Sequence, residues 1–318
     1  MIISKTPFRV SLFGGSTDYE SFYSKYGSLL IGFAMDRYCY IGARYTPLIL
    51  PYRTKISYSK IETVDDNRDI EHNGVRGVLE YLNMLDDPVE ITHISDLPSQ
   101  TGIGSSSSFV VGLLRAMMRN IDQKSLAKAA IKIEREILGE VGGIQDQIWA
   151  TYGGFNSIDI HRDGDFEVKP LPISDDFRDE FIFRSFLIYT GRTRNSFAIS
   201  ESHTKKSTIP AKIKILDTAQ KAYEYFLDQN IDEIGRMLKI GWSEKKKISN
   251  KVSSPHVDKM YDELLSRGMI GGKLLGSGGS GFIFGIGKDY HAVDCIKRDF
   301  RDNFIDVGIS NRGSEIIT

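Results

Sequence analysis

The chain carries, directly ahead of an apolar segment, the stretch Pro98-Ser99-Gln100-Thr101-Gly102-Ile103-Gly104-Ser105-Ser106-Ser107-Ser108. Its two alternate glycines permit close backbone approach, and its four consecutive serines supply hydroxyl groups and helix caps. The free N–H groups of a helix's first turn, together with the helix dipole, form a site for an anion such as a polyphosphate. A capped loop with a run of serines is the plainer interpretation. We favour phosphate binding because the glycines and the serines occur together.

The residues that follow this loop have helical periodicity. Val110, Leu113, Leu114 and Met117 recur at the spacing of one helical face, so a helix is expected from Ser105 onward. The anion site would therefore lie at the N-terminus of an amphipathic helix.

A second amphipathic helix is expected over residues 124–138. On its helical wheel Glu134 falls inside the apolar arc, toward one edge, whereas the lysines and Arg135 lie on the other side. A carboxylate turned toward the interior is costly unless it is paired or bound to a metal ion. A half-exposed glutamate paired with a lysine or arginine fits the same pattern, so both alternatives stay open.

Working outward, the sequence alternates between strands and helices. The N-terminal half is expected to hold strands at residues 1–13, 29–34, 38–45 and 89–94, with a helix at 75–85. The second half is expected to hold strands at 181–190, 269–275, 282–286 and 305–309, and helices at 213–228, 231–246, 257–267 and 290–301. Helices segregated from few strands favour an α+β fold. The length of 318 residues suits two domains, which we place at residues 1–170 and 171–318.

A glycine-rich stretch near the C-terminus, Gly271–Gly281, contains a formal G-x-G-x-x-G. A dinucleotide-binding fold requires a helix after this motif, whereas the following Phe282-Ile283-Phe284 has the character of a strand. We interpret the segment as a flexible wall between two strands that lies against a ligand.

Composition narrows the functional classes. Lysine and arginine number 41 against 42 aspartates and glutamates, and this net charge of -1 argues against a broad basic surface for nucleic acid. Phosphate can still be held by backbone amides, which carry no formal charge. The two cysteines, Cys39 and Cys295, form no C-x-x-C pair, so a zinc ribbon and a disulfide framework are not expected. No membrane-spanning run or signal peptide is visible, which favours a cytoplasmic protein without a membrane partner.

Several segments together resemble the GHMP kinase superfamily, named for galacto-, homoserine, mevalonate and phosphomevalonate kinases. The first motif is Pro7-Phe8-Arg9-Val10-Ser11-Leu12-Phe13-Gly14-Gly15-Ser16-Thr17-Asp18-Tyr19, the second is the Pro98–Ser106 loop, and the third is Leu274–Gly281. Between them, Glu134–Gly139 and Gly143-Ile144-Gln145-Asp146-Gln147 are similar to the family's metal-binding helix and catalytic aspartate segment. Taken alone, Asp146 could equally be a helix cap.

The resemblance implies a fold and an activity. The N-terminal domain would be a ribosomal-protein-like α/β domain with a left-handed crossover, and the C-terminal domain would be ferredoxin-like. The activity would be ATP-dependent phosphorylation, with ATP and Mg²⁺ as cofactors. The adenine would be sought near residues 53–76, and the protein would be a monomer or a homodimer.

The resemblance also implies roles for individual residues. Asp146 would take a proton from the attacking hydroxyl, and Arg9 beside it would keep that carboxylate ionised. Ser106 and Glu134 would hold the magnesium ion. The ATP phosphates would lie on Ser99, Gln100, Thr101, Gly102, Ile103, Gly104, Ser105, Ser106 and Ser107. The acceptor would be bound by Ser16, Thr17, Asp18, Gly276, Gly278 and Gly279.

The first motif lacks the Glu and His that galactokinases carry between Gly14 and Thr17. Its form resembles the sugar-1-kinase branch that acts on D-glycero-D-manno-heptose 7-phosphate, which would make the 1,7-bisphosphate for surface polysaccharide. Arg192, Arg194 and Lys273 are candidates for binding the 7-phosphate, although each could equally be a solvated charge. An L-fucose or other sugar 1-kinase is the alternative within the family. A catalytically inactive nucleotide-binding regulator is the alternative of another class.

Overall fold

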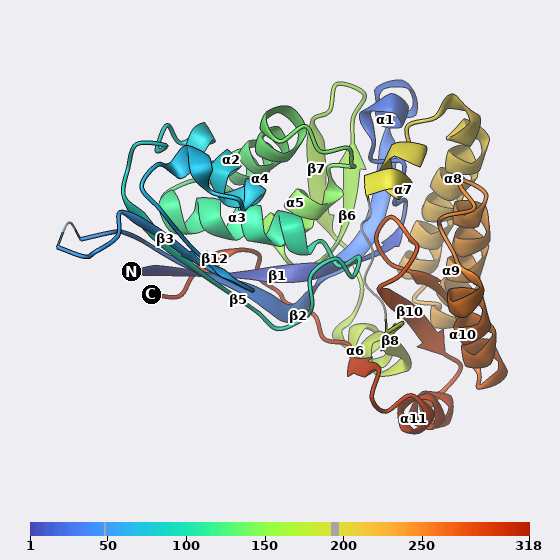
Figure 1. The fold of residues 1–318 in the computed structure, drawn as a ribbon. Helices are drawn as coiled ribbons and strands as arrows, with labels where there is room; N and C mark the ends of the chain where they lie inside the picture. The colour runs from blue at the N-terminus through green and yellow to red at the C-terminus, as the bar shows by residue number, and fades with distance from the viewer. Residues whose placement is uncertain (48, 192–196) are drawn as a thin grey trace.

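The computed structural model describes residues 1–47, 49–191 and 197–318, which fold around two sheets (Figure 1). The first sheet has eight strands in the order β12-β1-β2-β5-β3-β4, and β6 and β7 continue it from β2. These strands are β1 (Ile2–Phe13), β2 (Ser28–Tyr45), β3 (Thr54–Ser57), β4 (Ile61–Val64), β5 (Val89–Ser95), β6 (Phe155–Ile160), β7 (Phe166–Pro170) and β12 (Glu315–Ile316).

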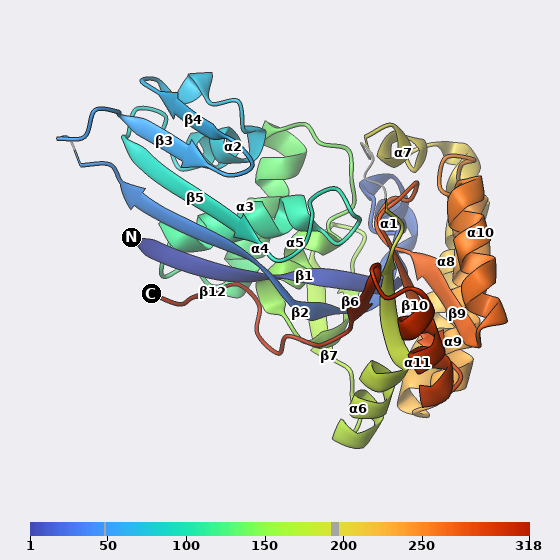
Figure 2. The same ribbon diagram turned by 60° about the horizontal axis from the view of Figure 1, so that its bottom comes forward.

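Helices cover one face of this sheet (Figures 1 and 2). The helices of the N-terminal half are α1 (Glu20–Tyr26), α2 (Asn73–Tyr81), α3 (Ser105–Met117), α4 (Gln123–Lys132) and α5 (Gln145–Tyr152), with a 3-10 turn, η1 (Asn67–Asp69), and a π turn, η2 (Ile133–Ile137). α3 packs on β1 and β2, because its apolar stripe faces their buried side chains. The predicted second amphipathic helix is thus α4 extended by η2.

The longest strand corrects one expectation. Two strands were expected around Met35-Asp36-Arg37, whereas β2 runs unbroken from Ser28 to Tyr45. Its first part pairs with β6 and its second part with β5, while β1 runs antiparallel to both parts. Met35 bridges to Ile309. The chain therefore stays extended there because neighbours distant in sequence supply its backbone hydrogen bonds.

The second sheet has four antiparallel strands in the order β11-β8-β10-β9. Its strands are β8 (Ser185–Tyr189), β9 (Met269–Leu274), β10 (Phe282–Gly287) and β11 (Phe304–Asp306). Its helices are α6 (Asp175–Arg184), α7 (Phe197–Ser202), α8 (Ile209–Leu227), α9 (Ile231–Lys246), α10 (Pro255–Ser266) and α11 (Tyr290–Asp299), with a 3-10 turn, η3 (Lys206–Thr208). Numbered along the chain, these strands have the 4-1-3-2 order of a ferredoxin-like domain. The expected α+β fold in two domains is confirmed.

The predicted strand at residues 181–190 begins too early, because a helix, α6, occupies its first four residues. Residues 181–184 were expected in a strand, but they form the last turn of α6, and β8 begins only at Ser185. The Ser174 hydroxyl caps this helix by accepting from the Phe177 N–H at 3.2 Å. An N-cap with Asp175 in the first turn favours a helix over the short apolar run that suggested a strand.

A cluster of phenylalanines joins the two sheets. The Phe33 ring of β2 lies 6.5 Å from Phe181 of α6 and 6.2 Å from Phe284 of β10, measured between centroids. Phe226 of α8 lies 5.9 Å from Phe181. Such close packing resists relative movement of the two parts. Residues from both sheets can therefore be held in one site.

The boundary between the two domains at residue 170 stays a prediction.

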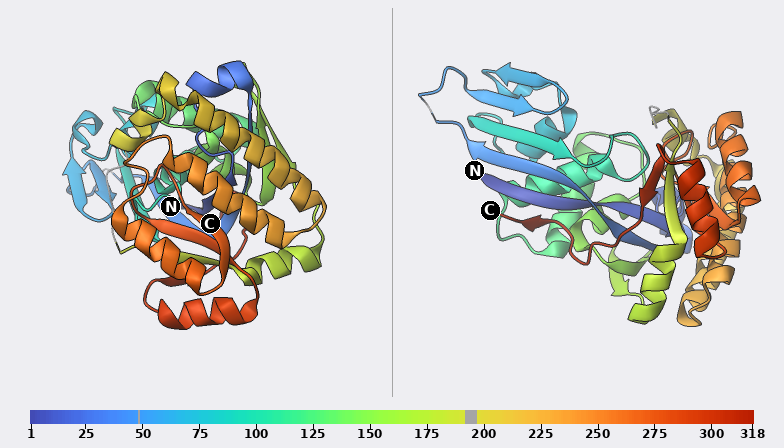
Figure 3. Two further views of the ribbon diagram at one scale, coloured as in Figure 1. Left: turned by 90° about the vertical axis from the view of Figure 1, so that its right-hand side faces the viewer. Right: turned by 90° about the horizontal axis from the view of Figure 1, so that it is seen from below.

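The C-terminal end of the chain belongs to the first sheet. β12 pairs with β1, so the two chain ends lie side by side (Figures 1 and 2). Helices α8, α9 and α10 gather at the opposite end of the molecule, beside the second sheet (Figure 3). In the described ranges, no helix is both long and apolar enough to cross a membrane.

Candidate active site

The glycine–serine loop leads into α3. Gly102 and Gly104 have φ angles of +80° and +76°, a region that favours glycine. The N–H of Arg9 in β1 donates to the Ile103 carbonyl at 3.0 Å, which holds the end of the loop. α3 begins at Ser105, and a helix leaves the N–H groups of its first turn without intrahelical partners. These donors, with the helix dipole, suit an anion.

The serines at this helix start have different surroundings. Ser105 and Ser106 line a cavity, and Ser106 is exposed. Ser107 also lines it, but its hydroxyl donates to Glu134 Oε2 at 3.1 Å. Ser108 points inward and donates to the Pro7 carbonyl at 2.9 Å. The serine hydrogen-bonded to Glu134 is therefore Ser107. The expected role of Ser106 and Glu134 as magnesium ligands stays a prediction.

The third motif packs directly against the glycine–serine loop. A Cβ added at Gly276 would lie 2.5 Å from the Gly102 Cα, and one added at Gly281 would lie 2.1 Å from the Thr101 carbonyl oxygen. The Phe282 N–H donates to that same carbonyl at 3.2 Å. These two glycines are therefore required for contact between two protein backbones, a role that the sequence analysis did not assign to them.

Glu134 lies in the π turn that continues α4, and it is 1% exposed. Its Oε2 accepts from Ser107, from Arg135 Nη2 at 3.1 Å and from Gln147 Nε2. Its Oε1 is buried and has no partner among the described residues. Burial raises the pKa of Glu134 to about 7, and the charge of Arg135 acts in the opposite direction. The carboxylate thus has one paired oxygen and one that is available to a cation.

Arg9 and Asp146 form a bidentate pair. Arg9 Nε donates to Asp146 Oδ1 at 2.8 Å, and Nη2 donates to Oδ2 at 2.7 Å. The third guanidinium nitrogen, Nη1, donates to the Gly102 carbonyl. The side chain of Arg9 is 5% exposed and that of Asp146 is 25% exposed. The arginine is therefore fixed in place, while the carboxylate keeps an edge open to the cavity.

The first motif folds back on itself beside this pair. Asp18 is buried, and its carboxylate accepts from the Ser16 N–H at 3.0 Å and the Gln145 N–H at 3.3 Å. A Cβ at Gly143 would lie 1.8 Å from Asp18 Oδ2, so only glycine fits there. Burial and the nearby charge of Asp146 raise the pKa of Asp18. The Thr17 hydroxyl donates to the Gly14 carbonyl at 2.7 Å and closes the turn.

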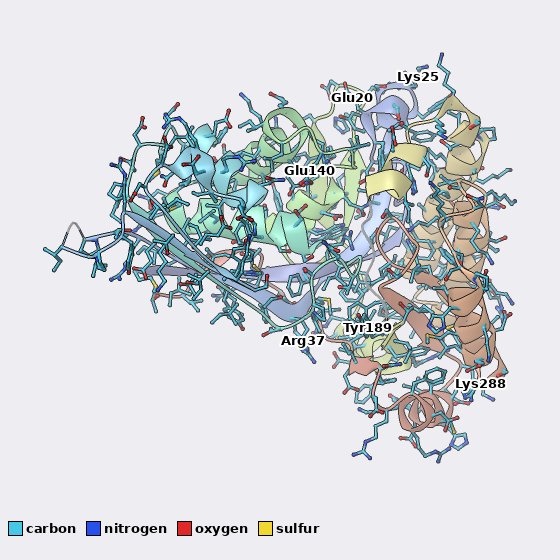
Figure 4. All side chains as sticks on the ribbon, in the orientation of Figure 1. Glu20, Lys25, Arg37, Glu140, Tyr189 and Lys288 are labelled. Atoms are coloured by element: carbon cyan, nitrogen blue, oxygen red, sulfur yellow. The ribbon has the colours of Figure 1, made fainter. Side chains whose placement is uncertain are left out.

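A single cavity of about 850 Å³ joins these parts. Glu140, labelled in Figure 4, lines it from the helical side of the first sheet. The candidate residues that line it are Arg9, Ser16, Asp18, Ser99, Gln100, Gly102, Gly104, Ser105, Ser106, Ser107, Glu134, Asp146, Lys273, Gly276 and Gly278. A cavity of this size accommodates a nucleotide together with a small acceptor.

Four candidates do not line the cavity. The side chains of Thr101 and Ile103 are buried, and the Thr101 hydroxyl donates to the Pro98 carbonyl at 2.7 Å. Thr17 is likewise buried in its turn. The Gly279 N–H donates to the Val252 carbonyl at 2.9 Å, so this glycine ties the third motif to the loop after α9.

Two further candidates, Arg192 and Arg194, lie outside the described residues. The phosphate role that the sequence analysis gave them therefore stays a prediction.

One end of the cavity is aromatic. The His72 and Phe109 rings stack with centroids 4.4 Å apart, and Tyr58 and His93 stand edge-on to this pair. Burial lowers the pKa of His72, and it lowers the pKa of His93 to about 4, so both rings are neutral near pH 7. Neutral stacked rings suit a flat heterocycle. This end includes part of the 53–76 region in which the adenine was expected.

The opposite end holds basic residues that sequence reasoning missed. Lys245 of α9 and His203 line the cavity beside the third motif. A signal for Lys245 existed, because it follows Leu238 and Trp242 on the buried stripe of α9, where a lysine is out of place. His203 had no such signal, since its stacking on Tyr19, with centroids 5.5 Å apart, joins distant parts of the chain.

Comparison with protein families agrees with this geometry. The family model for the GHMP kinase N-terminal domain matches residues 73–154, and the model for the C-terminal domain matches residues 222–306. The chain belongs to the GHMP kinase family. As a GHMP kinase, it is an ATP-dependent phosphotransferase.

Individual relatives are modestly similar to this GHMP kinase. It is 28% identical over 317 residues to the D-glycero-alpha-D-manno-heptose 7-phosphate kinase of Campylobacter jejuni. The aligned region covers 94% of each of the two chains. It is 24% identical over 258 residues to the L-fucokinase/L-fucose-1-P guanylyltransferase of Bacteroides fragilis, over 74% of this chain and 27% of that protein. The crystal structure of a D-glycero-D-manno-heptose 1-phosphate kinase from Bacteroides thetaiotaomicron superposes with a TM-score of 0.82 and 23% identity, covering 100% of this chain and 99% of that one.

Proposed function

We propose that this GHMP sugar kinase phosphorylates the anomeric hydroxyl, O1, of D-glycero-D-manno-heptose 7-phosphate and yields the 1,7-bisphosphate. The observation that carries the proposal is the Asp146–Arg9 pair, which faces the same cavity as the glycine–serine loop and Asp18. The similarity to the Campylobacter jejuni enzyme over nearly the whole chain supports the choice of sugar. The product would feed cytoplasmic synthesis of a nucleotide-activated heptose for surface polysaccharide.

ATP would lie along the cavity with its adenine at the aromatic end. The stacked His72 and Phe109 rings would contact the base. The first-turn amides of α3 would then receive the phosphates. The start of this helix lies close to Asp146, since a Cβ added at Gly104 would be 3.4 Å from Asp146 Oδ2. This direction would bring the γ-phosphate beside the Asp146 carboxylate.

Asp146 would act on the acceptor hydroxyl. Its open carboxylate edge would accept the proton as the hydroxyl oxygen attacks the γ-phosphorus, and the bond from that phosphorus to the β,γ-bridging oxygen would break. Arg9 orients the carboxylate through two hydrogen bonds and connects it to the loop through the Gly102 carbonyl. Base and phosphate loop are therefore held at a set separation, and positioning is the largest contribution that this chain can make to phosphoryl transfer.

The residues beside the loop fit a magnesium ion. Glu134 offers an unpartnered buried oxygen, and the exposed hydroxyl of Ser106 lines the same cavity. Among the described residues, no cluster of three or more Asp, Glu, His or Cys side chains could hold a metal ion alone. That suits Mg²⁺, which is commonly bound by one or two carboxylates plus substrate phosphates. When bound, the ion would neutralise charge on the ATP phosphates.

Glu134→Gln tests this assignment. We expect the concentration of Mg²⁺ needed for half-maximal rate to rise by about 10- to 100-fold, since a neutral amide is a poorer ligand for a hard cation. The matched control is Glu136→Gln, an exposed residue of the same turn, which should leave this concentration unchanged. An unchanged Mg²⁺ requirement in Glu134→Gln would remove Glu134 from the metal site.

The substrate is tested by ADP release with heptose 7-phosphate, free heptose, mannose, L-fucose and galactose. We expect kcat/KM to be highest for heptose 7-phosphate, by at least about tenfold, because one lost charged contact costs about 1.4 kcal/mol or more. The highest value for L-fucose would favour the alternative suggested by the fucokinase relative. ADP release with none of the sugars would contradict the kinase proposal and favour a nucleotide-binding regulator.

A further inference from the structure

Two buried lysines line the cavity, one from β9 and one from α9. Lys273 of β9 is 7% exposed and Lys245 of α9 is 4% exposed, and both line the cavity. Lys273 Nζ donates to the Leu12 carbonyl at 3.0 Å. Lys245 Nζ donates to the Leu274 carbonyl at 3.5 Å and to that of Gly276. An ammonium group has three donors, so each lysine retains at least one.

Neither ammonium group forms an ion pair with a described residue. Within the described part of the chain, no carboxylate lies within 4.0 Å of either Nζ. The arginines of the cavity differ, since Arg9 is paired with Asp146 and Arg135 with Glu134. Burial lowers the pKa of both lysines, to about 7 for Lys245, and the charge of Arg9 acts in the same direction on both, whereas the charge of Asp18 acts in the opposite direction. Keeping two buried lysines charged is costly, and a bound anion would offset that cost.

Two other polar side chains, Ser11 and Gln145, lie with Lys273 around the Cα of Gly15. A Cβ added at Gly15 would lie 3.2 Å from Ser11 Oγ, 3.5 Å from Gln145 Nε2 and 3.9 Å from Lys273 Nζ. Ser11 Oγ is buried and has no partner among the described residues, so its hydroxyl is available to donate. The absence of a side chain at Gly15 thus leaves three potential donors around one open point of the cavity wall.

This point belongs to the acceptor side of the cavity. Gly15 immediately precedes the Ser16–Asp18 turn, and the Gln145 N–H that bonds to Asp18 belongs to the residue before Asp146. The first-turn serines of α3 and Glu134 come from other elements and surround the proposed ATP phosphates. A phosphate at Gly15 would therefore be carried by the acceptor.

We propose that Ser11, Gln145, Lys245 and Lys273 bind, over Gly15, the phosphate monoester of the acceptor sugar and select a phosphorylated sugar over a free one. This inference rests on the proposed function only in that the acceptor is a sugar. It assigns the phosphate to buried residues of β1, α5, α9 and β9, whereas the sequence had suggested, besides Lys273, Arg192 and Arg194, which lie outside the described residues. The same donors could instead meet the γ-phosphate of ATP, and the experiment separates these two sources.

The test compares heptose 7-phosphate with free heptose in Lys273→Met and Gly15→Ala. Methionine keeps the length of the lysine side chain, and alanine fills the open point without removing a charge. We expect the ratio of kcat/KM for the two sugars to fall by about 10- to 100-fold in each variant, as loss of a charged hydrogen bond predicts. The KM for ATP should rise much less than the KM for heptose 7-phosphate. Lys246→Met, an exposed lysine next to Lys245, is the matched control and should keep the wild-type ratio.

The outcomes are distinct. An unchanged sugar ratio, or a rise mainly in the KM for ATP, would overturn the assignment to the acceptor. A wild-type enzyme that prefers free heptose would overturn it while leaving the sugar kinase intact. If no sugar is turned over, the proposed function fails, and calorimetry with heptose 7-phosphate and heptose decides the inference. Tighter binding of the phosphorylated sugar that Gly15→Ala removes would support it, and equal binding would overturn it. Should Lys273→Met not fold, Gly15→Ala provides the same comparison.

Discussion

Asp146→Asn is expected to lower kcat by about 100- to 10,000-fold, the contribution typical of a positioned general base. Asparagine has nearly the same shape but cannot accept the hydroxyl proton at neutral pH. It also presents an N–H₂ group to one of the two Arg9 donors that now bind carboxylate oxygens at 2.8 and 2.7 Å. The rate loss should therefore appear in kcat, measured by coupled ADP release at saturating ATP and sugar.

The binding of ATP distinguishes a lost base from a damaged site. Calorimetry should give nearly the same affinity for ATP in Asp146→Asn as in the wild type, because the glycine–serine loop remains in place. Asp159→Asn, a surface residue of β6 that is paired with Lys169, serves as the control and should retain full activity. Near-wild-type kcat in Asp146→Asn would show that the base is another group.

Gly276→Ala is expected to destabilise the enzyme by about 3 kcal/mol or more and to weaken ATP binding. The new Cβ would lie 2.5 Å from the Gly102 Cα, a backbone atom that cannot rotate away. Either the third motif or the phosphate loop must move, and both line the cavity. Urea denaturation measures the free energy of unfolding, and calorimetry measures the affinity for ATP.

Gly139→Ala provides a matched control for this variant. Gly139 has a φ of +62° against +66° for Gly276, but nothing lies within 4 Å of its added Cβ. It should cost only the roughly 1–2 kcal/mol of a left-handed conformation for an alanine, with ATP affinity preserved. Equal losses in the two variants would mean that backbone strain, and not contact between the loops, explains the glycine at position 276.

The near-zero net charge is consistent with a phosphate-binding cavity. With 41 basic and 42 acidic residues, the chain has no general attraction for anions. Its positive groups are instead local, namely the dipole of α3, the paired Arg9 and the two buried lysines. On the proposed function, phosphate would be recognised by a few donors held in a buried site, where they interact more strongly than they would in water.

Local patterns predicted the elements wherever neighbouring residues decide them. The stripe beginning at Val110 predicted α3, and the loop before it predicted a helix start at Ser105. Prediction failed where distant partners decide, as in β2, which stays extended through residues 35–37 because β1 and Ile309 bond to it. It failed also at residues 181–184, an apolar run with the composition of a strand that forms the end of α6, where Phe181 packs against Phe33 and Phe226.

The candidate site likewise contains residues that neighbouring sequence points to and residues that only distant contacts bring together. The glycine–serine loop could be singled out from its own residues. Arg9, Asp146 and Glu134 received their roles from the resemblance to GHMP kinase motifs, each of which is continuous in sequence, and those roles stay predictions. Lys245 could have been noticed as a lysine on an apolar stripe, but its partners could not.

By itself, the sequence determined the elements, the two-domain α+β class and the short motifs, since these depend on periodicity and on residues a few positions apart. Only the tertiary structure decided which motifs meet. It placed Gly276 against Gly102 and joined Ser107 to Glu134 by a hydrogen bond. It also brought Ser11, Gln145 and Lys273 together around Gly15. The physical reason is that such contacts join residues up to 262 positions apart, as Ser11 and Lys273 are, and form only when both sheets pack on the shared phenylalanine cluster.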